Sequence, residues 1–230
     1  MSLALFDLDH TLLDGDSNTL WLDHLVRHGH LPVDVQRQQA DYMARYAAQE
    51  LDIADYLGFH LQLLSKRPVA EWLAVRADFV ATEILPRISP AARDAVAAHR
   101  ANDDRLAIIT ATHSFLSSAI GELFHIPVIA PHAEIRDGHL SGQIEGELCF
   151  REKKLSCLNA WLAREGRGHE GIADCYFYSD SANDLPLLEA VAHPVAVNPD
   201  ESLAALAQQR GWPILQWRCT RFADSAKKAT

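Results

Sequence analysis

Cysteines are few in this sequence, and long apolar runs are missing. The four cysteines, Cys149, Cys157, Cys175 and Cys219, show no C-x-x-C spacing. Because three of them lie in or beside apolar segments, we expect buried free thiols rather than a zinc site or disulfides. No apolar stretch approaches the roughly 20 residues of a membrane-spanning helix. We therefore expect no membrane partner.

Positive charge is also scarce. The chain has 21 Lys and Arg against 31 Asp and Glu among 230 residues, a formal net charge of -10. Such a charge repels nucleic-acid backbones, so nucleic acid is not an expected partner. The first residues reach Asp7 without a basic segment or a leader-like apolar stretch, and the expected location is cytoplasmic. An anionic substrate must then be held by a local positive group.

Short apolar runs followed by oxygen-bearing side chains recur along the chain. They are Leu3–Phe6 before Asp7, Leu106–Ile109 before Thr110, and Cys175–Tyr178 before Ser179 and Asp180. Each run predicts a buried parallel strand, and helical patterns lie between the runs. The sequence thus predicts an α/β fold with a Rossmann-like, mostly parallel sheet and helices on both faces. Sheets of this kind bind ligands at the carboxyl ends of their strands.

Residues 16–86 differ, because they show amphipathic helical patterns and no convincing strand. The expected helices are 17–28, 33–49, 53–64 and 69–84, the first capped by Ser17. Such a block, inserted after the first strand, predicts a helical cap domain over the strand ends. The α/β core would then comprise residues 1–15 and 87–230.

Two later segments carry weaker signals. Residues 133–147 alternate polar and apolar side chains around Asp137-Gly138, which predicts an antiparallel hairpin at the edge of the core. The polar tail after Trp217 is expected to fray.

Two acidic pairs follow predicted strands. Asp7 and Asp9 are two residues apart, so both side chains can face one ligand. Asp180 and Asp184 form a second pair with Asn183 between them. A single loop acid would more simply cap a helix, but carboxylates from two strand ends suit Mg²⁺, which binds carboxylate and phosphate oxygens.

A hydroxyl and a lysine complete the pattern. Thr110 follows a strand and precedes a helix, where a hydroxyl and backbone N–H groups can meet an anion. Lys154 begins another predicted helix and could balance a phosphoryl group, although the adjacent Lys153 is an alternative.

In this order, the motifs resemble those of the haloacid dehalogenase-like superfamily, and more narrowly its phosphoserine phosphatase-like branch. They are Asp7-Leu8-Asp9-His10-Thr11, then Thr110, Lys154 and Asp180 to Asp184, with the helical insertion after the first. The resemblance implies a Mg²⁺-dependent phosphoric monoester hydrolase that acts on a small phosphorylated metabolite. Two residues depart from the usual pattern: Ser179 stands where glycine is frequent, and His10 lies inside the first motif.

The resemblance also implies roles for individual residues. Asp7 is the nucleophile and a metal ligand, and Asp9 is the general acid and base with its main-chain carbonyl on the metal. Asp180 is the second metal carboxylate. Thr110 and Lys154 hold phosphoryl oxygens. Asp184 and Asn183 do not bind the metal directly and act on it through water or through the residues that do.

Substrate recognition is less defined. Asp16 lies where phosphoserine phosphatases place an acidic substrate-reading residue, which implies an amine-bearing phosphate such as phosphoserine or histidinol phosphate. Arg45, Arg67 and Arg76 are candidates for reading a carboxylate.

Other functions remain open. A phosphotransferase or mutase would use the same intermediate, and a binding protein could retain the residues without activity. Asp9 argues against a dehalogenase, which needs no acid for a leaving group there. His24 and His28, with His30 nearby, also have the i, i+4 spacing of a metal-binding pair, although no third ligand is evident.

Overall fold

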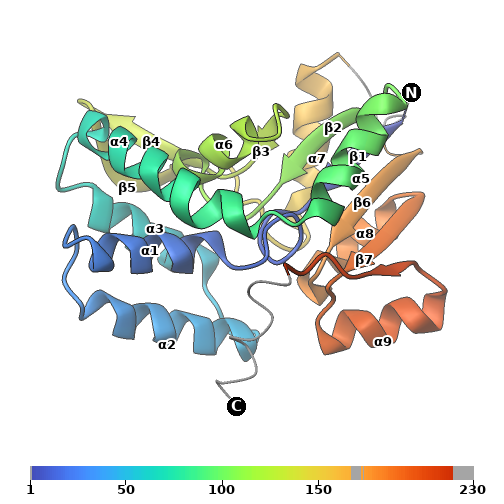
Figure 1. The fold of residues 1–230 in the computed structure, drawn as a ribbon, viewed down its shortest axis with the longest axis horizontal. Coiled ribbons are helices and arrows are strands. Elements are labelled where there is room, and N and C mark those ends of the chain that lie inside the picture. Colours follow the sequence, from blue (N-terminus) through green and yellow to red (C-terminus); the bar gives the residue numbers. More distant parts are fainter. Residues whose placement is uncertain (1, 167–171, 173, 220–230) are drawn as a thin grey trace.

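A computed structural model describes residues 2–166, 172 and 174–219. In this part of the chain, six strands form one sheet in the order β3-β2-β1-β6-β7-β8 (Figure 1). They are β1 Leu3–Phe6, β2 Arg105–Ile109, β3 Val128–Ile129, β6 Cys175–Ser179, β7 His193–Val197 and β8 Ile214–Leu215. Every pairing in the sheet is parallel. The predicted α/β fold is therefore confirmed.

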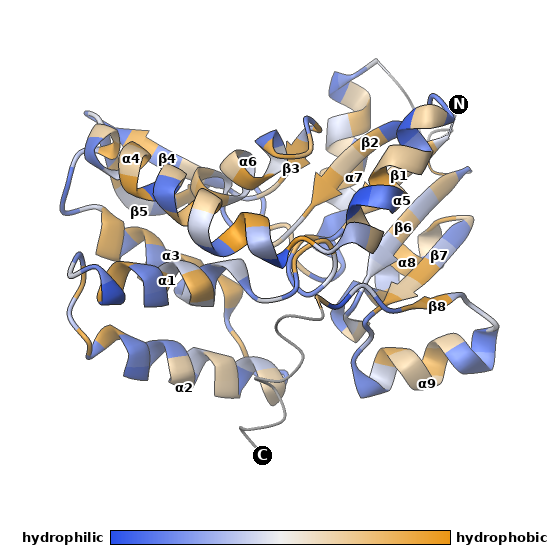
Figure 2. Cartoon of the chain, in the orientation of Figure 1, coloured by the Kyte–Doolittle hydropathy of each residue, from blue (hydrophilic) through white to orange (hydrophobic). Residues whose placement is uncertain are grey.

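Helices cover both faces of the sheet. They are α5 Pro90–Ala101, α6 Ser114–Glu122, α7 Lys153–Arg164, α8 Leu185–Ala190 and α9 Glu201–Arg210, with a 3₁₀ turn, Ala182–Asp184, before α8. Ala4 and Phe6 of β1 join a buried cluster with α5 and α6. Leu3 and Leu5 join a second cluster with α7, α8 and α9. The division follows from the strand geometry, because successive side chains point to opposite faces. Hydrophilic residues gather instead on loops and outer helix faces (Figure 2).

A block of helices lies to one side of the sheet, between β1 and β2 in the chain (Figure 1). It contains α1 Ser17–Arg27, α2 Val35–Ala47, α3 Ile53–Leu64 and α4 Val69–Phe79, followed by a π-helical turn, Val80–Ile84, and a 3₁₀ turn, Leu85–Arg87. The predicted N-cap residue of α1 was wrong by one position. Asp16, not Ser17, is the N-cap, and its carboxylate accepts a hydrogen bond from Thr19 N–H at 2.7 Å. The division into a cap of residues 16–86 and a core remains a prediction.

The predicted hairpin forms, but not at the predicted place. Its strands are β4 His132–Arg136 and β5 His139–Glu145, which pair around Asp137-Gly138 outside the six-stranded sheet. In its turn, the Gly138 carbonyl accepts a hydrogen bond from Val69 N–H at 2.8 Å. Farther along β5, Gly142 lies against Gln62 of α3. The hairpin therefore packs on the helical block, because its apolar side finds a partner there.

Other expectations concern smaller features. The four cysteines are free, and three of them are buried. Among the described residues, no helix is both long and apolar enough to cross a bilayer. Of the tail expected to fray, residues from 220 onward lie outside the described part of the chain.

Two glycines of the hairpin allow a matched test of its packing. Both have positive φ, +78° at Gly138 and +84° at Gly142. A Cβ at Gly138 would meet nothing within 4 Å, whereas one at Gly142 would lie 2.9 Å from Gln62 Cγ. Gly138→Ala should cost about 1–2 kcal/mol of unfolding free energy from backbone strain alone. Gly142→Ala should cost more, by about 1–3 kcal/mol of overpacking. Equal losses in urea unfolding would show that the hairpin does not depend on its contact with α3.

Candidate active site

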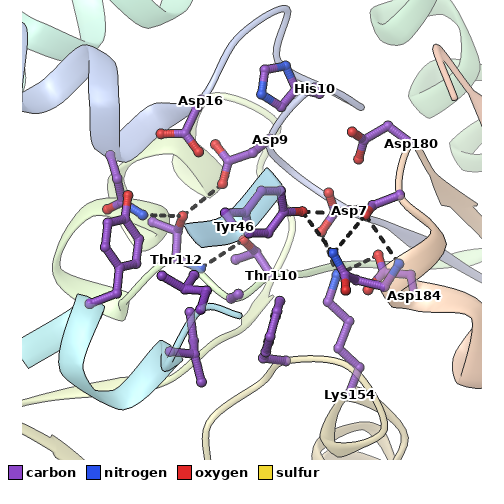
Figure 3. Close-up of a pocket in the computed structure, with 18 of the residues that line it drawn as sticks. Asp7, Asp9, His10, Asp16, Tyr46, Thr110, Thr112, Lys154, Asp180 and Asp184 are labelled. Carbon is purple, nitrogen blue, oxygen red and sulfur yellow. Dashed lines mark hydrogen bonds and ion pairs between the residues drawn. The ribbon is translucent and has the colours of Figure 1, made fainter. Parts of the chain in front are cut away.

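All eight residues predicted for the site line one cavity, of about 130 Å³, at the carboxyl ends of the strands (Figure 3). They are Asp7, Asp9, Asp16, Thr110, Lys154, Asp180, Asn183 and Asp184. Their convergence follows from strand order, since β1 lies between β2 and β6. The structure thus brings together residues up to 177 positions apart, from Asp7 to Asp184.

Lys154 lies at the centre of the charged groups. Its ammonium group donates to Asp7 Oδ1 at 2.6 Å and to Asp184 Oδ2 at 2.7 Å (Figure 3). The residue is 3% exposed. Burial by itself would lower the pKa of Lys154, but the charges of Asp184 and Asp7 outweigh burial and raise the pKa. Lys154 is therefore held charged, whereas Lys153 is exposed and does not line the cavity.

The acids outnumber this one cation. Burial raises the pKa of Asp7 to about 7, against the attraction of Lys154 and with a further contribution from Asp184. Burial, followed by the charges of Asp7 and Asp184, raises the pKa of Asp180 well above its usual value. The carboxylates of Asp7, Asp180 and Asp184 together carry more negative charge than the single ammonium group of Lys154 can balance in a buried site. A divalent cation would relieve it, so the donor set of Asp7 and Asp180 fits Mg²⁺.

The carboxylate of Asp9 is turned toward the helical block. It accepts from the backbone N–H of Ser17 at 2.6 Å and from the Thr112 hydroxyl at 2.8 Å. Burial, and then the charge of Asp16, raises the pKa of Asp9 to about 6 despite these hydrogen bonds. A group with such a pKa can both give and take a proton near neutral pH. Both oxygens of the Asp9 carboxylate are thus engaged in hydrogen bonds to Ser17 and Thr112.

Thr112 was not predicted. Its hydroxyl also lies 3.2 Å from Ser17 Oγ and accepts from Asn18 Nδ2 at 3.1 Å, while its N–H donates to Thr110 Oγ1 at 3.1 Å. Because Thr110 Oγ1 accepts this bond, the Thr110 hydroxyl proton can still be donated to another group. In the sequence, only its position two residues after Thr110 could have pointed to Thr112.

Tyr46 and Arg151 were also missed, and they connect the helical block to the loop after β6. Asn183 Nδ2 donates to the Tyr46 hydroxyl at 3.2 Å, and Arg151 Nε donates to Asn183 Oδ1 at 3.1 Å. Arg151 Nη2 in turn donates to the Gln49 carbonyl at 3.2 Å. Because Tyr46 and Asn183 both line the cavity, their bond joins the helical block to the loop after β6 at the cavity wall. Nothing local in the sequence pairs Tyr46 with Asn183.

The two departures from the family pattern have structural explanations. The Ser179 hydroxyl donates to Asp184 Oδ2 at 2.7 Å, so it helps to hold the carboxylate that binds Lys154. His10 adopts a positive φ of 56°, and its carbonyl accepts from Asn198 Nδ2 at 2.9 Å. That bond ties the loop after β1 to the end of β7.

None of the three candidate arginines lines the cavity. Arg45 lies over the Tyr42 ring, Arg67 over the Trp72 ring, and Arg76 over Phe115, whose carbonyl it also binds. The cavity wall from the helical block is instead neutral apart from Asp16. Its residues are Asn18, Met43, Tyr46, Leu51, Ile53 and Tyr56.

Comparison with known proteins gives consistent matches. Residues 4–189 match the haloacid dehalogenase-like hydrolase family. A histidinol-phosphatase of Neisseria meningitidis is 37% identical over 94% of this chain and 99% of its own. A phosphoserine phosphatase of Mycobacterium tuberculosis is 31% identical over 96% of this chain and 72% of its own. A crystal structure of a Bordetella pertussis protein of unknown function has a TM-score of 0.88 at 43% identity, covering 93% and 97% of the two chains.

The raised carboxylate pKa values predict how pH and Mg²⁺ act on stability. A folded-state pKa of about 7 for Asp7, against 3.8 in the unfolded chain, means that the folded state holds more protons between these values. Without metal, stability should therefore fall as pH rises from about 4 to 7. Mg²⁺ should raise the unfolding temperature more at pH 8 than at pH 5.5, where protons compete for the same oxygens.

Differential scanning fluorimetry at both pH values measures this effect. Asp180→Asn is the control, since it should lose most of the Mg²⁺ response while the contact of Lys154 with Asp7 remains. A Mg²⁺ effect that is equal at the two pH values, or equal in the variant, would contradict the predicted metal site.

Proposed function

Because this chain belongs to the haloacid dehalogenase-like hydrolase family, we propose that it is a Mg²⁺-dependent phosphatase that hydrolyses a small phosphomonoester through an aspartyl-phosphate on Asp7. The observation that carries the proposal is the placement of Asp7 against the buried Lys154 in a cavity lined by further acids. A lysine there attracts a phosphoryl group, and Asp7 can attack it. Mg²⁺, held by Asp7, Asp180 and the Asp9 carbonyl, would neutralise charge on the carboxylate and the phosphate.

The first step transfers the phosphoryl group to the protein. An Asp7 carboxylate oxygen forms a bond to phosphorus as the bond from phosphorus to the leaving oxygen breaks. Asp9 donates its proton to that oxygen, so the product departs as a neutral alcohol. Lys154 and the Thr110 hydroxyl stabilise charge on the phosphoryl oxygens.

The second step regenerates the protein. Asp9, now ionised, takes a proton from water, and the water oxygen attacks phosphorus. The bond between Asp7 and phosphorus breaks, which releases inorganic phosphate and restores the carboxylate. The Asp9 pKa of about 6 suits both halves of this cycle. The helical block would limit water access from the side of Asn18 and Tyr56.

Substitutions of the two acids should separate their roles. Asp7→Asn should reduce turnover roughly a thousandfold or more, because no nucleophile remains. Asp9→Asn should reduce turnover by about 100- to 10,000-fold, the usual contribution of a general acid and base. The measurement is phosphate release from a phosphomonoester panel with and without Mg²⁺.

Intact-mass spectrometry tests the intermediate itself. Asp9→Asn should accumulate a chain heavier by one phosphoryl group, whereas Asp7→Asn should not. Near wild-type turnover by Asp7→Asn would contradict the nucleophile. Phosphate release that requires an added acceptor alcohol would favour a phosphotransferase or mutase, and no turnover of any substrate would favour a binding protein.

The cavity also favours one kind of substrate. Among the described lining residues, Asp16 is the only acid outside the motifs, and Lys154 is the only lysine or arginine. Lys154 is already committed to Asp7 and Asp184. We propose that the substrate carries an amine, read by Asp16, and no carboxylate. Histidinol phosphate meets both conditions, whereas phosphoserine has the amine but also carries a carboxylate. The relative from N. meningitidis is named a histidinol-phosphatase.

Substrate competition tests this preference. Histidinol phosphate should have a kcat/KM at least about tenfold above that of phosphoserine, because the carboxylate of phosphoserine would lie unpaired in an acid-rich cavity. Asp16→Asn should lose much more activity on histidinol phosphate than on an amine-free alkyl phosphate, for which only the effect of Asp16 on the pKa of Asp9 is removed. Asn is also a good N-cap, so the change removes the charge and keeps the start of α1. Equal kcat/KM values for phosphoserine and histidinol phosphate would contradict the assignment.

A further inference from the structure

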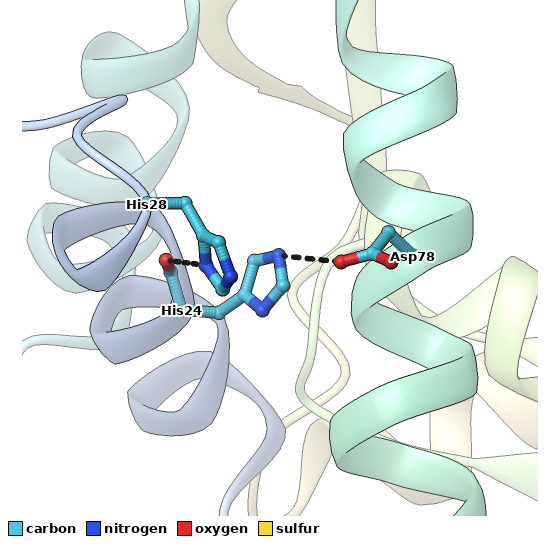
Figure 4. A group of neighbouring side chains, drawn as sticks. All are labelled: His24, His28 and Asp78. Carbon is cyan, nitrogen blue, oxygen red and sulfur yellow. Dashed lines mark hydrogen bonds and ion pairs between the residues drawn. The ribbon is translucent and has the colours of Figure 1, made fainter.

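A second group of potential ligands lies outside the catalytic cavity, on the helical block. His24 lies in the last turn of α1 and His28 is the C-cap of that helix, and Asp78 faces them from α4 (Figure 4). One ligand atom from each of the three residues lies within 4.8 Å of the other two. His24 Nε2 and Asp78 Oδ2 are 3.6 Å apart, beyond ordinary hydrogen-bond distance. None of these residues lines the catalytic cavity.

His28 is oriented as a metal-binding histidine usually is. Its Nδ1 lies 2.8 Å from the main-chain carbonyl of His24. Because a carbonyl can only accept, Nδ1 carries the proton and Nε2 keeps a free lone pair. Metal-ligating histidines typically use this arrangement, in which the other ring nitrogen donates to a carbonyl or carboxylate.

His24 provides an independent observation. Its side chain is 1% exposed and packs against the rings of Trp21 and Phe79, with centroid distances of 6.0 and 5.5 Å. The nitrogen that faces the proposed site is Nε2, which lies 3.6 Å from the Asp78 oxygen and makes no hydrogen bond among the described residues (Figure 4). Nδ1, on the other side of the ring, also has no hydrogen-bond partner among the described atoms, but it is turned away from Asp78 (Figure 4). A buried imidazole without a hydrogen bond is costly unless another ligand binds it.

We propose that His24, His28 and Asp78 bind a transition-metal ion of the Zn²⁺ type and so join α1 to α4. Two imidazoles and a carboxylate are a frequent Zn²⁺ donor set, while Mg²⁺ prefers oxygen alone. With bonds of about 2.1 Å, tetrahedral donors lie roughly 3.4 Å apart, so the 3.6 Å pair is already close to the required spacing. Asp78 and His28 are exposed and can move to complete the site.

The charges around the site are compatible with a cation. Arg27, the arginine at the end of α1, forms an ion pair of 2.5 Å with Glu83, which offsets its charge. His30, which the sequence placed near the pair, lies elsewhere: Arg67 Nη1 is 3.3 Å from its Nδ1, and its ring meets Trp72. The third ligand is therefore Asp78, which is 50 residues beyond His28 in the chain.

Calorimetric titration with Zn²⁺, in excess Mg²⁺ to occupy the catalytic cavity, tests the proposal. Wild-type protein should bind one Zn²⁺ per chain. His28→Gln and Asp78→Asn should each weaken binding by at least about tenfold, because losing even a supporting partner of a metal ligand has that effect. Both residues are exposed, so the variants should unfold at the wild-type temperature without Zn²⁺.

Two control variants make the outcome specific. His132→Ala removes an exposed histidine that pairs with an acid at 3.3 Å on the hairpin, and it should bind Zn²⁺ as the wild type does. Asp7→Asn should also retain the Zn²⁺ site, whatever its effect on turnover. Unchanged affinity in His28→Gln and Asp78→Asn, or loss of the site in Asp7→Asn, would overturn the proposal.

Discussion

The buried ammonium group of Lys154 allows opposing carboxylates to share one cavity. Asp7 comes from the end of β1, Asp184 from the 3₁₀ turn after β6, and Lys154 from the first turn of α7. Removing one partner of such a buried pair usually costs about 3–5 kcal/mol, because the remaining charge is left unpaired. The same contact therefore fixes three separate segments and sets the charge of the site. It leaves Asp180, which has a hydrogen bond from Thr11 at 3.3 Å, as the acid with most need of a cation.

The helical block reaches Asp9, the proposed general acid, through the start of α1. Ser17 N–H, in the first turn of that helix, donates to Asp9, and the helix N-terminus favours its ionised form. Burial and the neighbouring Asp16 favour the protonated form. The balance between these effects places the pKa near neutrality, so a displacement of α1 would change both the position of Asp9 and its proton affinity. The block that encloses the cavity is thus also part of the acid's environment.

The sequence predicted features that depend on neighbouring residues and missed those that depend on packing. Leu3–Phe6 and the other apolar runs formed strands because a buried parallel strand leaves a continuous apolar signal. The two-residue strand β3 was too short to give one. The Asp137-Gly138 turn was predicted for the same local reason, but the surface on which its hairpin packs is a property of α3.

The side chains that orient the site illustrate the same limit. Tyr46, Thr112 and Ser17 matter through partners far away in the sequence, and no spacing rule connects them. The candidate arginines show the converse, because the sequence suggested a role for them that their positions in the fold do not support. Arg76 has the charge to bind a carboxylate, yet its guanidinium donates to the Phe115 carbonyl and lies over that ring. Charge identifies a candidate, but competition among neighbouring acceptors decides where it binds.

The net charge of -10 makes binding of any phosphate dianion unfavourable at long range. A substrate with its own amine reduces that penalty. In the proposed complex the amine would also neutralise Asp16, whose charge now raises the pKa of Asp9, and so would lower that pKa. The phosphoryl group, as an anion beside the same carboxyl, would raise it. The two ends of the substrate thus act on Asp9 in opposite directions, and the acid can keep a pKa near neutrality when the cavity is filled. A phosphate ester without the amine would lack this compensation, so recognition by Asp16 and proton transfer by Asp9 are electrostatically linked.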